Sequence, residues 1–109
     1  MAYSESLAER IRQALRQRPD IQEKKMFGGV GFLMNGNMLV GVWQQSLIVR
    51  LGAEQAKDAL KQPFVGEFDI TGKPMKGWVM VDPDGIDFDS DLRAWIEQAE
   101  TFVETLPKK

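Results

Sequence analysis

Apolar and polar residues alternate through residues 24–51, and this pattern predicts strands of an antiparallel sheet joined by tight turns. The dipeptide Asn35-Gly36 lies between two apolar runs and favours a two-residue hairpin turn, because both turn positions require positive φ. Gln44-Gln45 separates the second run from the third as a weaker turn signal. A further strand is expected at 23–27. It ends at Gly28-Gly29, where a turn, a bulge or a close backbone approach would explain two adjacent glycines.

These turns predict how the strands pair. With Asn35-Gly36 as the loop, Phe32 lies opposite Leu39, and with Gln44-Gln45 as the loop, Val40 lies opposite Val49. Two faces follow from that register. The expected core face carries Leu33, Met38, Val40, Val42, Leu47, Val49 and Leu51, with Gly29 and Gly31. The opposite, mixed face is too apolar for simple exposure to water and is a candidate partner surface: Val30, Phe32, Leu39, Trp43, Ile48 and Arg50.

Helical periodicity appears in three places around this sheet. An N-terminal helix, capped by Ser4 or Ser6, has a narrow apolar stripe formed by Leu7, Ile11 and Leu15. A short helix is expected at 53–60. The third helix has the widest apolar face, which consists of Leu92, Trp95, Ile96, Ala99, Phe102, Val103 and Leu106.

Two further strands, at 66–70 and 77–81, are separated by turn residues and are expected to join the same sheet. The order is therefore helix, four strands, helix, two strands, helix. This order predicts an α+β fold of two layers, with a mainly antiparallel, meandering sheet of five to six strands. Residues 1–109 are expected to form a single domain.

The composition of the chain restricts the catalytic and metal-binding chemistry that it can perform. The chain of 109 residues contains no histidine and no cysteine, which removes the commonest general base, thiolate catalysis and the usual zinc ligands. The aspartates of 82–91 alternate as calcium ligands might, but glycine and glutamate do not fall at the positions that an EF-hand loop needs. We therefore expect no enzyme activity, no cofactor and no metal. The enzymatic alternative would need a carboxylate with a tuned lysine, such as Asp69 with Lys73 or Lys76.

No apolar run approaches the roughly 18 residues of a membrane-spanning helix, and charges interrupt the N-terminal segment every few residues. A cytoplasmic protein without membrane contact is expected. The net charge of −2 argues against direct binding to nucleic acid. The alternative that remains is contact through the basic N-terminal residues Arg10, Arg12, Arg16, Arg18, Lys24 and Lys25. A small-molecule pocket lined by Met26, Met34, Met38, Met75 and Met80 is another alternative.

Several short segments together resemble one known family. They are MFGG, followed by the G-F-x-x-N-G-N-M hairpin, then LIVRLG, and finally GKPMKGW. In these segments and their spacing, residues 7–108 resemble the TfoX (Sxy) N-terminal domain family. The motif residues that carry the resemblance are Met26, Phe27, Gly28, Gly29, Gly72, Pro74, Met75, Gly77 and Trp78.

The resemblance implies a two-layer α/β fold with a meandering sheet and a bacterial origin. Some members of that family regulate natural competence together with a transcription factor and carry a second, C-terminal domain, so this chain resembles a stand-alone copy. The leading hypothesis is therefore a non-enzymatic regulatory or protein-interaction module. Its expected partner is another protein, for example a transcription factor, or a second copy of the chain in a homodimer, bound through the mixed face.

Overall fold

The computed structural model describes residues 3–16, 18, 20–26, 28–69 and 75–108. Its elements follow the chain in this order: α1 (Glu5–Ala14), β1 (Ile21–Met26), β2 (Gly29–Met34), β3 (Asn37–Trp43), β4 (Ser46–Arg50), α2 (Ala53–Ala59), β5 (Val65–Glu67), β6 (Trp78–Val81), the 3-10 helix η1 (Pro83–Ile86) and α3 (Asp89–Val103). The predicted order of helices and strands is confirmed.

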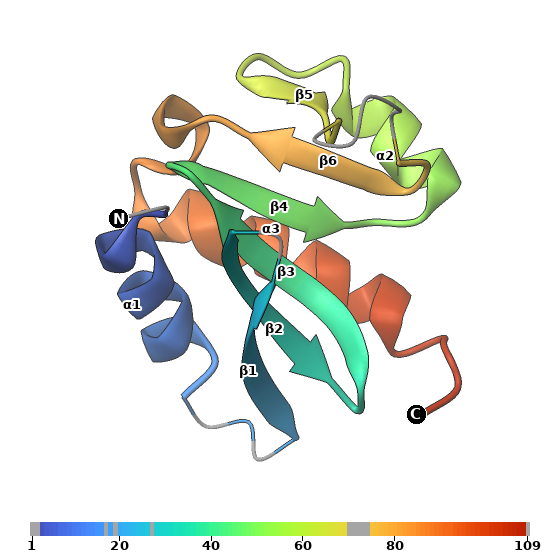
Figure 1. Ribbon diagram of the computed structural model, residues 1–109. Coiled ribbons are helices and arrows are strands. Elements are labelled where there is room, and N and C mark those ends of the chain that lie inside the picture. Colours follow the sequence, from blue (N-terminus) through green and yellow to red (C-terminus); the bar gives the residue numbers. More distant parts are fainter. Residues whose placement is uncertain (1–2, 17, 19, 27, 70–74, 109) are drawn as a thin grey trace.

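The strands form one six-stranded antiparallel sheet in the order β1-β2-β3-β4-β6-β5. The second hairpin joins the sheet as predicted, with β6 beside β4 and β5 at the edge. Figure 1 shows α3 running behind β3 and β4, with α1 beside it, so these helices form the second layer. Apolar residues of α1 and α3 share one buried cluster with the sheet.

The Asn35-Gly36 turn forms as the sequence predicts, with φ of 54° and 83°. Met34 pairs with Asn37 directly beside it. The second predicted register is also confirmed, because Val40 pairs with Val49. At the N-terminus, the hydroxyl of Ser4 caps α1 by accepting a hydrogen bond from the amide of Leu7 at 3.1 Å.

The predicted pairing of Phe32 with Leu39 is wrong. The register shifts between Phe32 and Leu33, so Phe32 pairs with Val40 and Leu39 becomes the extra residue of a β-bulge. An extra residue reverses the alternation of side chains beyond it. Val30 and Phe32 therefore share the face of Val40 and belong to the core.

Most of the predicted partner surface is buried. Four of its six residues, Val30, Phe32, Leu39 and Ile48, are at most 2% exposed. Trp43 and Arg50 are half-buried. The predicted core face changes as well, because Leu33 and Met38 are only half-buried. Most of the mixed face expected from the sequence is therefore not accessible to a partner.

The buried cluster shows which layer each strand faces. Val40, Val42, Leu47, Val49, Val79 and Val81 are completely buried and lie on the side of the sheet that α1 and α3 cover. In α3, Leu92, Trp95, Ile96, Ala99 and Val103 are buried as predicted, whereas Phe102 is half-buried, as is Leu106 beyond the end of the helix. Burial of such side chains, at about 25 cal/mol per Å² of apolar surface, is the main term that holds the two layers together.

Glycine permits close packing at two positions in the sheet. A Cβ on Gly29 would collide with the carbonyl oxygen of Val42, which confirms a close backbone approach as the reason for glycine there. A Cβ on Gly41 would lie 2.8 Å from the Met38 methyl and 2.9 Å from the Val30 carbonyl oxygen. Gly28 adopts a φ of 78° in the turn between β1 and β2, and a strand follows it instead of the helix that a phosphate loop requires.

Gly41→Ala is expected to destabilise the fold by about 1–3 kcal/mol, because the backbone oxygen of Val30 cannot move away as a flexible side chain can. Gly66→Ala is the matched control, since a Cβ there meets nothing within 4 Å. It should be neutral or stabilise the protein by up to about 1 kcal/mol. Urea denaturation of both variants measures this difference, and equal effects would contradict the observed packing.

Candidate functional site

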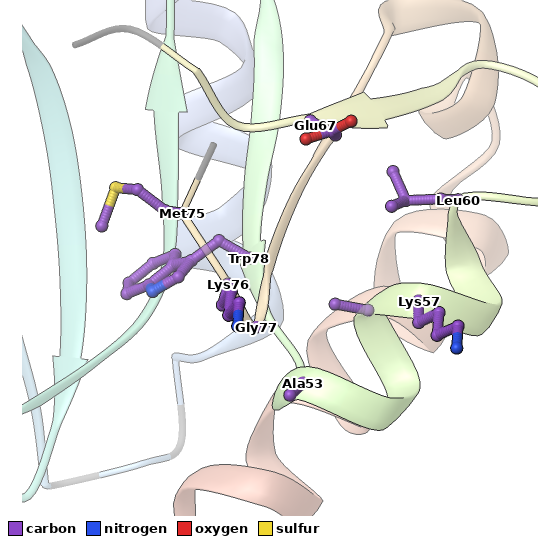
Figure 2. Close-up of a pocket in the computed structure, with 9 residues that line it drawn as sticks. Ala53, Lys57, Leu60, Glu67, Met75, Lys76, Gly77 and Trp78 are labelled. Atoms are coloured by element: carbon purple, nitrogen blue, oxygen red, sulfur yellow. The ribbon is translucent and has the colours of Figure 1, made fainter. Parts of the chain in front are cut away.

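A groove of about 320 Å³ opens between α2 and the beginning of β6. Its lining residues come from α2, β5 and the segment that leads into β6: Ala53, Ala56, Lys57, Leu60, Glu67, Met75, Lys76, Gly77 and Trp78. Figure 2 shows Leu60 at the end of α2 and Glu67 of β5 on two sides of this opening. The groove is therefore assembled from three successive parts of the chain within residues 53–78.

The groove combines apolar walls with a few charges at its margin. Leu60 and Met75 are 37% and 39% exposed, so two large apolar side chains of the groove remain in contact with solvent. Lys57 and Lys76 are exposed, and Glu67 is the single carboxylate among the lining residues. This arrangement suits a ligand that brings an apolar group together with a negative charge.

A backbone contact holds the two strands together beside the groove. The carbonyl oxygen of Gly77 accepts hydrogen bonds from the amides of Leu51 at 2.8 Å and Gly52 at 3.1 Å. Gly52 and Gly77 each have a φ of 87°, which other residues rarely adopt. A Cβ on Gly52 would also lie 2.7 Å from the ring of Phe102. These two glycines thus bring the end of β4, the beginning of β6 and α3 together.

Arg50 lies at this junction, where it pairs with Trp78 across β4 and β6. Its guanidinium carbon is 5.3 Å from the centroid of the Trp78 ring and 5.9 Å from that of Phe102. These distances are typical of cation–π contacts. The centroid of the Trp78 ring also lies 6.0 Å from that of Phe68, which is buried. Trp78 therefore belongs to both the groove and the surroundings of Arg50.

The arginines predicted to contact nucleic acid form hydrogen bonds and ion pairs within the fold. Arg10 contacts Asp89 at 3.1 Å and donates to the carbonyl oxygen of Ile86 at 2.6 Å. Arg12 donates two hydrogen bonds, of 2.8 and 2.7 Å, to the carboxylate of Glu23. These contacts join α1 to β1 and to the beginning of α3.

Of the remaining basic residues, the two arginines have partners within the fold and the two lysines are exposed. Arg18 forms an ion pair with Glu100 of α3, and Arg16 donates to Gln13 at 3.4 Å. Lys24 and Lys25 are exposed on β1. Because three of these six basic residues are already paired with carboxylates, the alternative of direct nucleic-acid contact loses half of its positive charges.

The other predicted residues are dispersed. Of the methionines, Met34 is buried in the core, Met38 lies beside Gly41 and Met75 lines the groove, so they do not form one pocket. Asp69 and Lys76 are both exposed, and none of the ion pairs between described residues joins them. Lys73 lies outside the described residues. No cluster of three carboxylate, histidine or cysteine side chains in the described ranges could hold a metal ion.

The family motif residues fall into two groups. Met26, Gly28 and Gly29 surround the turn between β1 and β2, whereas Met75, Gly77 and Trp78 line the groove. Phe27, Gly72 and Pro74 lie outside the described residues. Sequence reasoning missed the contributions of Lys57, Leu60 and Glu67. The small residues of α2 were the available signal, because Ala53 and Ala56 leave space beside the helix.

Fold and site together define a two-layer α+β domain with an open, mainly apolar groove at one end of an antiparallel sheet. The chain belongs to the TfoX N-terminal domain family, whose sequence model matches residues 13–103. No curated protein matches the chain. Among the described residues, no helix combines the length and the apolar character needed to cross a membrane.

Glu23 and Glu100 have pKa shifts of opposite sign. Hydrogen bonding from Arg12 lowers the pKa of Glu23 below its usual 4.5, so this carboxylate stabilises the fold above that pH and loses the effect as the pH falls through its folded pKa. Burial raises the pKa of Glu100 above 4.5, although the charge of Arg18 opposes the shift. Ionisation of Glu100 therefore reduces stability as the pH rises from 4.5 through the folded pKa.

Urea denaturation at about pH 4 and about pH 7 should separate the two glutamine variants. Relative to the unmodified protein, Glu23→Gln is expected to lose more stability at the higher pH. The stability of Glu100→Gln, relative to that of the unmodified protein, should be greater at the higher pH than at the lower one. If both variants changed with pH in the same direction, the assigned shifts would be wrong.

Proposed function

We propose that this protein is a non-enzymatic regulatory module that acts by binding a protein partner in the groove between α2 and β6. The observation that carries the proposal is the half-exposed apolar pair Leu60 and Met75 in a concave site of about 320 Å³. Exposed apolar side chains in a concavity are typical of binding sites rather than of ordinary protein surface.

The composition of the groove favours binding over catalysis. A catalytic site needs a nucleophile or base held beside a second group that activates or orients it. The ionisable side chains that line the groove are Lys57, Glu67 and Lys76, and all three extend from an exposed position. Hydrated lysines at the rim of an apolar groove suit the recognition of a partner.

Membership of the TfoX N-terminal domain family supports a regulatory role. We propose a cytoplasmic partner, for which a transcription factor in a competence pathway and a second copy of this chain are the two candidates that the resemblance suggests. Both would use the same physical contact, in which an apolar side chain of the partner fills the space between Ala53, Leu60 and Met75.

A photo-crosslinking amino acid at Leu60, introduced in the native cell, tests this proposal. Leu60 lines the groove, so the variant should yield a discrete crosslinked partner. Ala53→Trp in the same chain should abolish that product, because it fills the groove from an exposed position. The crosslinker at Gln98, an exposed residue of α3, is the control and should not capture the same partner. Equal products from both positions, or none from Leu60, would contradict the proposal.

A further inference from the structure

Arg50 differs from the arginines of the N-terminal region in having no acceptor. Arg10, Arg12 and Arg18 each contact a carboxylate. Within the part of the chain that the structure describes, no hydrogen bond or ion pair involves the guanidinium of Arg50, although its side chain is half-buried. Arg93 also lacks a partner there, but it is exposed on α3. The side-chain nitrogens of Arg50 are not among the buried atoms that lack a partner, so they are open to solvent and to an acceptor that a ligand supplies.

The position of Arg50 is fixed by its surroundings. The rings of Trp78 and Phe102 hold the guanidinium by cation–π contacts, and the backbone beside it is held by the hydrogen bonds to Gly77. Contact with a ring face leaves the N–H edge of a planar guanidinium available, and that edge matches the two oxygens of a carboxylate. Because the side chain is already ordered, an arriving anion does not have to order it.

The charge around this position is also one-sided. Arg50 pairs with Trp78, which lines the groove, and Lys57 and Lys76 lie along the same groove. Glu67 is the one acidic residue among the lining side chains. Together with Arg50, the lining side chains therefore carry three positive charges and one negative charge, on a chain whose net charge is −2. This charge distribution is complementary to a negatively charged partner.

We propose that the groove and Arg50 together bind an acidic peptide segment of a partner protein. An apolar side chain of that segment enters the groove, and a carboxylate beside it pairs with Arg50 through the free N–H edge. This inference rests on the proposed function and adds the chemistry of the partner. It also gives a reason for Trp78, whose ring orients Arg50 and whose position borders the groove.

Selection of random heptapeptides displayed on phage against the purified protein tests the proposal. The selected peptides should combine an aromatic or aliphatic residue with an aspartate or glutamate. A parallel selection against Arg50→Gln should keep the apolar preference and lose the acidic one. If the acidic preference is absent, or persists in Arg50→Gln, the role of Arg50 is wrong while the groove remains a binding site. If no motif is enriched, both this inference and the proposed function are wrong.

Affinity measurements with the most enriched peptide, labelled with fluorescein, then compare matched variants. Arg50→Gln is expected to weaken binding about tenfold or more, the scale of a lost charge-assisted hydrogen-bonded pair. Arg93→Gln removes the exposed, unpaired arginine of α3 and should leave the affinity unchanged. Arg50→Lys keeps the charge but not the planar fork, so it should bind more weakly than the unmodified protein. Equal losses for Arg50→Gln and Arg93→Gln would overturn the proposal, because they would reflect net charge alone.

A second copy of the chain is the competing occupant. Residues 84–91 carry four aspartates around Phe88, which is 70% exposed. This segment therefore combines an exposed apolar side chain with carboxylates, as the proposed acidic peptide does. Sedimentation velocity over a range of concentrations distinguishes the two sources. A monomer at all concentrations supports a separate partner. Self-association that disappears in both Arg50→Gln and Phe88→Ser would assign the site to the protein itself and overturn the partner assignment.

Discussion

The carbonyl oxygen of Gly77 connects the parts of the molecule on which its proposed function depends. It accepts hydrogen bonds from Leu51 and Gly52, and this contact fixes the end of β4 against the beginning of β6. The pairing of Arg50 with Trp78, the approach of Phe102 and the opening beside α2 all follow from that junction. Two glycines with positive φ make it possible, so a few backbone positions, rather than a large apolar surface, place the candidate site.

Much of the fold could be predicted because local signals agreed with the final packing. Asn35-Gly36 favours its turn wherever it occurs, and the apolar periodicity of α3 identifies the face that the sheet covers. It was harder to predict which residues share each face of the sheet. One extra residue, Leu39, reverses the alternation between β2 and β3, and no local signal in the sequence distinguishes a bulge there from a regular hairpin.

The candidate site was harder still, because its residues come from three separate elements. Leu60, Glu67 and Trp78 lie around one groove because β6 lies between β4 and β5 in the sheet. The sequence identified Arg50 as part of a contact surface, but most of the other residues predicted for that surface are buried. In the structure Arg50 remains half-buried for a different reason, namely the two aromatic rings beside it. The arginines of the N-terminal region likewise form contacts within the fold that their spacing alone does not reveal.

A protein partner is proposed to bind at the junction of α2, β4 and β6. Two-dimensional NMR of the ¹⁵N-labelled protein tests this binding most directly. Spectra are recorded before and after addition of the purified partner that the crosslinking experiment identifies. The account predicts that the largest changes occur at the backbone amides of Leu60, Gly77 and Trp78 and at the side-chain N–H of Arg50. Changes concentrated instead on α1 or on the exposed residues of β1, with the Arg50 signal unmoved, would contradict it.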